Sequence, residues 1–129
     1  MIAVDTSAVL AILLKEDDAE RFAEALAEDD APLMSSANFV EAGIVLRMKR
    51  GPEAERELDA LLETAGISIE PVTGDQGRVA IRAYATYGRG NHPARLNFGD
   101  CFAYSLAKMA GIPLLFKGQD FSLTDLTVT

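Results

Sequence analysis

Residues 1–14 read MIAVDTSAVLAILL, and they decide the fold. Met1 to Val4 predict a short buried strand that ends at Asp5, and Ser7 is the expected N-cap of a helix that runs to about Leu14. Open α/β sheets bind ligands just outside the carboxyl ends of their strands, which is where this carboxylate stands. Asp5 is therefore the first candidate for a functional residue.

The rest of the chain alternates helical and strand-like patterns. Helices are expected from residue 17 or 18 onward, from 35 or 36 to about 50, from 52 to a stop at 66, over 74–87 and over 97–110. Strands are expected over 31–35 at a sheet edge, over 67–72 and over 113–117, with 126–129 as a further short candidate. This alternation predicts an α/β fold with three α/β/α layers around a mostly parallel sheet of about four or five strands.

Size and composition favour a single domain over residues 1–129. Hydrophobic residues make up 49% of the chain, enough for one sizeable core. No apolar stretch approaches the roughly 18 residues of a membrane span, and the apolar run after Asp5 lacks the basic flank of a signal peptide. The single cysteine, Cys101, cannot form an internal disulfide and is expected to be buried. We therefore expect a cytoplasmic protein without a membrane partner.

The net charge of −8 is unevenly distributed. Residues 1–46 contain 10 acids and 2 bases, whereas residues 47–129 contain 10 of each. Much of the excess acid falls within residues 16–30, a pattern typical of a solvated helix face. Basic residues gather at 47–50 and again between 78 and 95. The overall charge therefore does not exclude a nucleic acid, although phosphate binding usually calls for Lys and Arg.

Glu41 interrupts an apolar stripe of its helix. At 100° per residue it shares an arc with Ala37, Ile44, Val45 and Met48. An acid inside a buried stripe must face a polar cavity or meet a cation, because burying an unpaired charge costs several kcal/mol. The alternative is a glutamate at the edge of the stripe whose carboxylate reaches water.

Two further acids are expected near Asp5. Asp100 stands three residues after Asn97, the expected N-cap of the last long helix, and the helix dipole alone would explain an acid there. Asp120 follows the strand at 113–117, at the same sheet edge as Asp5, and Asp125 is an alternative to it. Such a cluster is stable only if protons or a divalent cation neutralise it, and carboxylate oxygens suit Mg²⁺ or Mn²⁺.

The motifs around these acids resemble PIN-domain ribonucleases, in particular the VapC-type toxins of bacterial toxin–antitoxin pairs. The matching stretches are residues 2–8, the helix of Glu41 after two serines, residues 96–104 and residues 115–121. The resemblance spans the chain with its motifs in the family's order. It implies a PIN-like domain and a Mg²⁺- or Mn²⁺-dependent endoribonuclease. It also implies a homodimer that a small cognate antitoxin inhibits in a heterotetramer or a larger complex.

By this resemblance, the catalytic and metal-binding residues would be Asp5, Glu41, Asp100 and Asp120. We expect Asp5 and Asp100 to be the main metal ligands in the in-line hydrolysis of an RNA phosphodiester. Supporting hydroxyl and amide groups would come from Thr6, Ser7 and Asn97. Arg89 and Arg95, in or beside a glycine-rich loop, are the candidates for phosphate contacts, although either can be an ordinary solvated arginine.

Other interpretations are weaker but distinct. A haloacid-dehalogenase type of enzyme would require a second Asp at position 7, which is Ser7, and a receiver domain has no counterpart to Glu41. A non-catalytic PIN-like module that binds RNA or protein would have no use for four acids. His92 precedes a proline and is expected to be a loop residue rather than a general base. Base stacking by Tyr84, Tyr87 or Phe98 is possible, but their spacing fits helix packing equally well.

Overall fold

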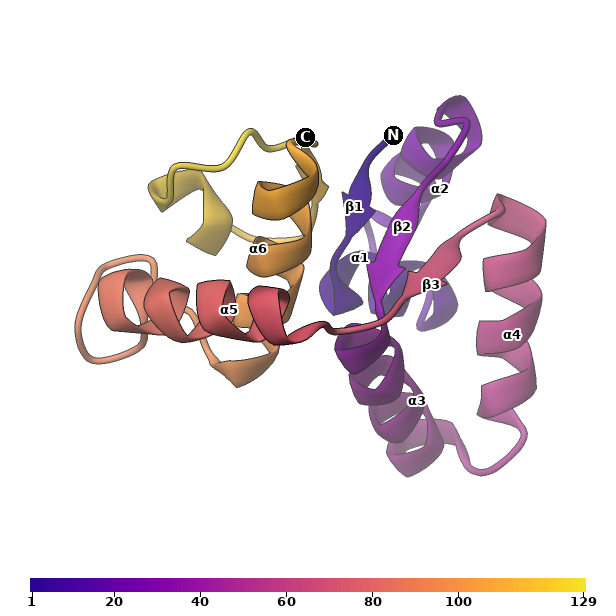
Figure 1. Ribbon diagram of the computed structural model, residues 1–129. Coiled ribbons are helices and arrows are strands. Elements are labelled where there is room, and N and C mark those ends of the chain that lie inside the picture. The colour runs from indigo at the N-terminus through magenta and orange to yellow at the C-terminus, as the bar shows by residue number, and fades with distance from the viewer.

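The computed structural model describes all 129 residues and has a four-stranded, fully parallel sheet at its centre (Figure 1). The strands are β1 (Ala3–Val4), β2 (Leu33–Ser35), β3 (Ser68–Glu70) and β4 (Leu114–Leu115), in the order β3-β2-β1-β4. Ala3 pairs with Leu33 on one side and with Leu114 on the other. Successive strands thus run outward from β1 in both directions, which places the switch point of the sheet between β1 and β4.

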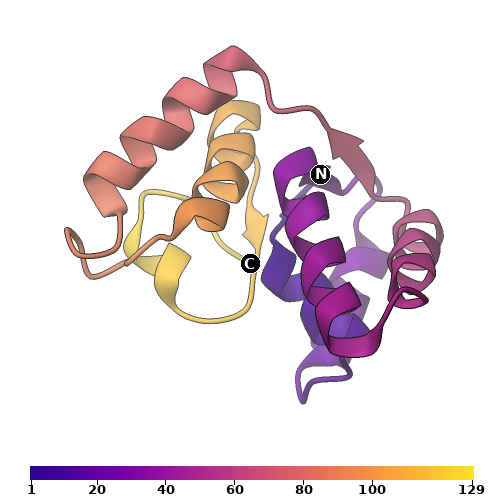
Figure 2. The same cartoon turned by 90° about the horizontal axis from the view of Figure 1, so that it is seen from below.

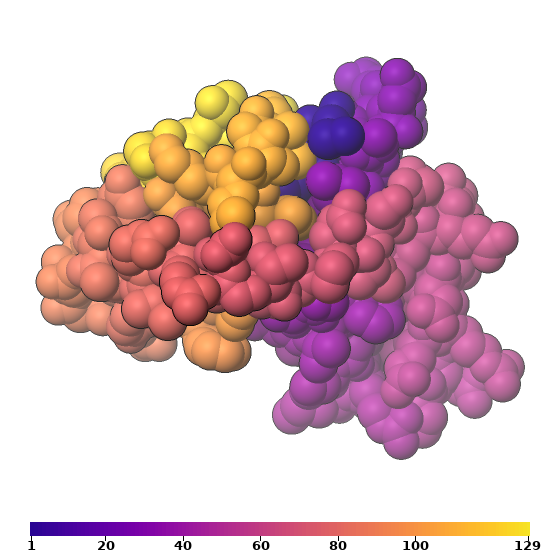
Figure 3. Space-filling view, in the orientation of Figure 1, coloured from indigo at the N-terminus to yellow at the C-terminus, as the bar shows by residue number.

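Helices cover both faces of this sheet, as the predicted α/β/α layering requires. They are α1 (Thr6–Leu13), α2 (Ala19–Glu28), α3 (Ser36–Arg50), α4 (Ala54–Ala65), α5 (Gly74–Tyr87) and α6 (Phe98–Ala110), followed by the 3₁₀ turn η1 (Asp120–Leu123). Val4 and Leu115 pack in one core with α1 to α4, whereas Ala3 and Leu114 pack in a second core with α5 and α6. The view in Figure 2 separates these two groups of helices, and Figure 3 shows α5 lying across α6 at the surface.

Helix termini differ from the sequence-based prediction at one important position. Asp5, not Ser7, is the N-cap of α1, because its extended backbone (φ −78°, ψ 156°) lets its carboxylate accept a hydrogen bond from the Ser7 N–H. Ser7 therefore lies inside the first turn of the helix. The predicted cap Asn97 is confirmed at α6, and of the two serines before α3 it is Ser35 that forms the N-cap.

Three other details of the prediction are wrong. β2 is an interior strand rather than an edge strand, because β3 pairs along its outer side. The predicted strand at 126–129 is reduced to a single parallel bridge between Leu114 and Val128. The helix expected from residue 52 begins at Ala54, after a turn at Pro52.

The apolar face predicted for α3, which contains Ile44 and Met48, is not the face that the helix buries. Ile44 and Met48 are 55% and 81% exposed, whereas the residues of α3 that face the interior are Asn38, Ala42 and Leu46. Because α3 also contacts α6, a polar residue can lie on its buried side. None of the helices combines the length and the apolar character that a membrane-spanning helix needs.

Candidate active site

Asp5 lies at the switch point of the sheet, 4% exposed. Its backbone N–H donates to the carbonyl oxygen of Leu115 in β4 at 3.0 Å. Its Oδ2 accepts hydrogen bonds from the N–H of Ser7 at 3.0 Å and from the Ser7 hydroxyl at 2.6 Å. The same hydroxyl oxygen accepts from the backbone N–H of Lys117 at 2.9 Å, so Ser7 connects Asp5 to the segment that follows β4.

Glu41 is held from two sides. The buried Thr6 hydroxyl donates to Glu41 Oε1 at 2.6 Å, which connects the start of α1 to the middle of α3. On the other side the Glu41 carboxylate lies against Gly99 in the first turn of α6. A Cβ atom at position 99 would stand 2.7 Å from Glu41 Oε1 and 2.8 Å from its Cδ, so a residue with a side chain does not fit without displacing the carboxylate.

Asp100 is fixed by the capping box of α6. The Asn97 side chain accepts from the Asp100 N–H, and Asp100 Oδ2 accepts from the Asn97 N–H, each at 2.9 Å. This reciprocal pair satisfies two backbone donors that a helix amino terminus otherwise leaves free. Each of the three residues predicted to support the acids thus forms a direct hydrogen bond with one of them: Thr6 with Glu41, Ser7 with Asp5 and Asn97 with Asp100.

Asn38 and Gly99 are two residues of this region that the sequence analysis missed. Asn38 is fully buried, and its Nδ2 donates to the Gly99 carbonyl oxygen at 3.0 Å across the α3–α6 contact. The sequence did contain one indication of Asn38: it stands three residues before Glu41, and residues at this spacing are neighbours on a helix surface. The need for glycine at position 99 depends on the position of Glu41 and has no local signal.

The acids influence one another electrostatically. Burial raises the pKa of Asp5 to about 6, with a further contribution from the charge of Glu41 that the hydrogen bonds from Ser7 partly oppose. Burial likewise raises the pKa of Asp100 to about 7, to which the negative charges of Asp5, Asp120 and Glu41 add. The fold therefore brings the other three predicted acids within electrostatic range of Asp100.

Asp120 and its alternative, Asp125, have different surroundings. Asp120 begins η1 and lines a cavity of about 340 Å³ together with Arg89, Arg95 and Asn97. Asp125 instead accepts hydrogen bonds from the Tyr104 hydroxyl at 2.6 Å and from Lys108 Nζ at 2.7 Å. These bonds hold the pKa of Asp125 below its ordinary value and attach the C-terminal segment to α6 through its carboxylate. Asp120 is therefore the better candidate for the fourth acid.

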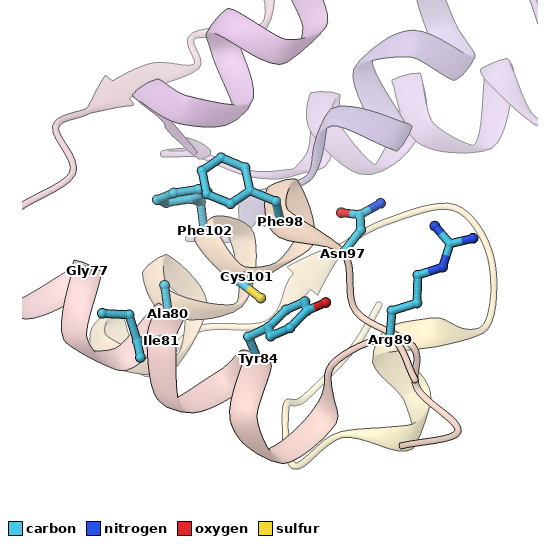
Figure 4. Close-up of a pocket in the computed structure, with 9 residues that line it drawn as sticks. All are labelled: Gly77, Ala80, Ile81, Tyr84, Arg89, Asn97, Phe98, Cys101 and Phe102. Carbon is cyan, nitrogen blue, oxygen red and sulfur yellow. The ribbon is translucent and has the colours of Figure 1, made fainter. Parts of the chain in front are cut away.

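An apolar groove of about 710 Å³ lies between α5 and α6 beside this cavity (Figure 4). Arg89 and Asn97 line both hollows, and Phe98, 77% exposed, forms part of the apolar wall. Cys101 is buried at the groove's base, as predicted. His92 accepts a hydrogen bond at Nδ1 from the Ala94 N–H and packs edge-on against Tyr87, which gives it a structural place in the loop.

The donor chemistry of the cluster suits a hard cation. None of the salt bridges in the structure includes any of the four acids. The hydrogen bonds described above use one oxygen of each of Asp5, Asp100 and Glu41, so a second oxygen is available for a ligand. The acids do not form a ready-made cage of three metal ligands.

Comparisons with known proteins identify the family. A family model described as the PIN domain matches residues 2–126. Ribonuclease VapC30 of Mycobacterium tuberculosis is 48% identical over 125 residues, 97% of this chain and 95% of that protein. The crystal structure of Mycobacterium tuberculosis VapC20, described as a Sarcin-Ricin loop cleaving toxin, superposes with a TM-score of 0.80 at 20% identity, covering 98% of this chain and 97% of that one.

A toxin–antitoxin complex from Klebsiella pneumoniae has the same fold, with a TM-score of 0.76 at 16% identity that covers 100% of this chain and 97% of the matched chain. These two structures are too distant in sequence to show more than the fold. The family model and the relative at 48% identity show more, because each covers nearly the whole chain. The chain therefore belongs to the PIN-domain family, and within it to the VapC ribonucleases.

Proposed function

We propose that the chain is a divalent-metal-dependent endoribonuclease that hydrolyses RNA phosphodiester bonds as the toxin of a toxin–antitoxin pair. The observation that carries the proposal is that the charges of Asp5, Glu41 and Asp120 all act on Asp100, beside an Asp5 that is buried at the end of β1. Both the burial of Asp5 and the mutual repulsion of these acids favour uptake of positive charge. The relatives named as VapC ribonucleases support RNA as the substrate class.

Asp5 and Asp100 would hold the cation, with Glu41 and Asp120 holding a second one or orienting its water ligands. Bound there, Mg²⁺ or Mn²⁺ would supply charge neutralisation and an activated water for attack on phosphorus. The residues of the chain contribute orientation. Ser7 and Asn97 fix the two aspartates, and the Thr6 hydroxyl fixes Glu41. Pre-organisation of this kind removes the entropic cost of assembling the site during the reaction.

Arg89 and Arg95 are our candidates for contacts with the RNA backbone. Both line the cavity that contains Asp120, and neither takes part in a salt bridge, so their guanidinium groups are available to phosphate. Arginine forms bidentate hydrogen bonds with phosphate oxygens. The positive charges of Arg89 and Arg95 would also attract RNA toward the four acids, whose negative charges otherwise repel it.

We further propose a homodimer and a small cognate antitoxin as partners, in a heterotetramer or a larger complex located in the cytoplasm. The Klebsiella pneumoniae structure, a toxin–antitoxin complex of the same fold, supports an antitoxin partner. Val40, Ile44 and Met48 of α3 are 54%, 55% and 81% exposed, so this helix presents apolar area for a protein to cover. The free, buried Cys101 is consistent with a reducing compartment.

The test is cleavage of a total-RNA and tRNA panel by antitoxin-free protein in Mg²⁺, in Mn²⁺ and in EDTA. Asp100→Asn keeps an oxygen that can accept from the Asn97 N–H, so the capping box survives while the charge is lost. We expect its cleavage rate to fall at least about 100-fold, because a metal ligand contributes several kcal/mol to transition-state stabilisation. Asp75→Asn, a matched change at an exposed acid of α5, should cleave normally. Full activity of Asp100→Asn, or cutting in EDTA, would contradict the proposal.

A further inference from the structure

Asn38 joins two of the elements that carry the acids. It lies three residues before Glu41 in α3, and its Nδ2 donates to the carbonyl oxygen of Gly99, the residue immediately before Asp100. Its own backbone carbonyl oxygen lies 3.3 Å from the oxygen of the Thr6 hydroxyl, whose single hydrogen is donated to Glu41 at 2.6 Å. Asn38 is thus connected to the segment of Asp100 by its side chain and to the segment of Asp5 by its backbone.

The Asn38 amide is not fully satisfied by the protein. Its Oδ1 is buried and has no hydrogen-bond partner. A flipped amide would place this oxygen against the Gly99 carbonyl, acceptor facing acceptor, so the orientation is fixed by the α6 backbone. Asp18 Oδ1 also lacks a hydrogen bond but lies 3.2 Å from Lys117 Nζ, which leaves Asn38 Oδ1 as the buried side-chain atom with neither a hydrogen bond nor an ion-pair partner.

This arrangement is costly for stability alone. An unpaired buried acceptor is unfavourable, and an apolar residue of similar size would avoid it. What an apolar residue cannot supply is the donor to Gly99. Without that bond, the first turn of α6 is free to shift relative to α3, and the gap between Glu41 and Gly99 is no longer fixed.

We propose that Asn38 is a positioning residue that sets the distance between Glu41 and Asp100, and through it the affinity of the cluster for a divalent cation. This inference rests on the proposed function. Asn38 acts at one remove from the ligands, since it contacts the backbone of the turn that carries Asp100. Groups in this position usually change metal affinity by about 10- to 100-fold when they are removed.

The test is calorimetric titration of the full-length protein with Mn²⁺ alone, comparing the native chain with Asn38→Ala. The matched control is Ser105→Ala. Ser105 is also buried in α6, and its hydroxyl donates across a helix pair, to the Gln76 carbonyl oxygen of α5 at 2.6 Å. Both changes remove one buried hydrogen bond to a backbone carbonyl group, but only one of these bonds reaches the acid cluster. Unfolding midpoints measured in parallel show how much each change destabilises the fold.

We expect Asn38→Ala to raise the Kd for Mn²⁺ at least about tenfold, and Ser105→Ala to leave that Kd unchanged although it also lowers the unfolding midpoint. Equal Kd values in the two variants would overturn the inference and leave the proposed function intact. Native protein that neither binds Mn²⁺ nor cleaves RNA would overturn the proposed function itself. Should Asn38→Ala fail to fold, Asn38→Ser takes its place, because serine keeps a polar group but is too short to reach Gly99.

Discussion

Replacing Asp5 by asparagine should make the metal-free protein more stable at alkaline pH. Asp5 is almost fully buried at the end of β1, and its pKa in the folded chain is about 6, against 3.8 for an ordinary aspartate. Because its pKa is raised, the folded state binds the proton more tightly than the unfolded state does. The unfolding free energy is therefore highest below pH 4 and decreases as the pH rises through about 6.

The size of this loss follows from the shift. About 2 pKa units at 1.36 kcal/mol each correspond to about 3 kcal/mol once the carboxylate is fully ionised. Asparagine carries no charge and avoids this loss, and its oxygen can still accept from the Ser7 N–H. Its NH₂ group replaces a carboxylate oxygen and lacks an evident acceptor, which costs about 1 kcal/mol. At pH 8 we therefore expect the unfolding free energy of Asp5→Asn to exceed that of the native chain by about 2 kcal/mol. For a chain of this size, this difference raises the unfolding midpoint by about 8 °C.

Urea unfolding in EDTA, followed by circular dichroism at pH 4, 6 and 8, measures the effect. The native chain and Asp5→Asn should be nearly equal at pH 4 and diverge as the pH rises. Asp75→Asn, at an exposed site, should run parallel to the native chain throughout. A difference between Asp5→Asn and the native chain that stays constant from pH 4 to pH 8, or a variant less stable at pH 8, would refute the reasoning. Burial of Asp5 would then not raise its pKa.

Gly99→Ala should lower both the unfolding midpoint and the affinity for Mn²⁺, because the new Cβ collides with the carboxylate that faces it; Gly77→Ala, at an open position inside α5, should raise the midpoint slightly. Thermal unfolding and Mn²⁺ titration of the two variants decide this, and equal effects would contradict it. Asp120→Asn should lower the pKa of Asp100, since the charge of Asp120 raises it, whereas Asp125→Asn should leave that pKa unchanged and loosen the C-terminal segment. A ¹³C NMR titration of the Asp100 carboxyl group in each variant measures this pKa. A lower pKa of Asp100 in Asp125→Asn alone would make Asp125, rather than Asp120, the fourth acid.

Local patterns were sufficient to predict the frame of the site. Apolar runs mark the strands, and because the strands are parallel, residues that follow β1 and β4 meet at one sheet edge. That rule predicts Asp5 and Asp120 at the same sheet edge without knowledge of any contact. The three-residue spacing of Asn97 and Asp100 at a predicted helix start is also local, and the structure shows that the two residues form a capping box there.

Helical periodicity was insufficient for α3. It determines which residues share a face of the helix, but the face that is buried depends on the neighbouring elements. The apolar Ile44 and Met48 are exposed, while Asn38 is buried because α6 offers it a carbonyl oxygen. Strand order is likewise not encoded locally, which is why β2 was misplaced at the sheet edge. Both errors concern the packing of elements rather than their existence.

The two central acids are held by the hydrogen bonds that begin helices. Asp5 is the N-cap of α1, and Asp100 is the third residue of α6, in a capping box. A helix amino terminus offers free N–H groups and a partial positive charge, so it can stabilise a carboxylate without a basic side chain. A lysine or arginine in that role would neutralise the cluster permanently. Helix ends orient the acids and leave most of their charge uncompensated, which is the condition that a cation-dependent site requires.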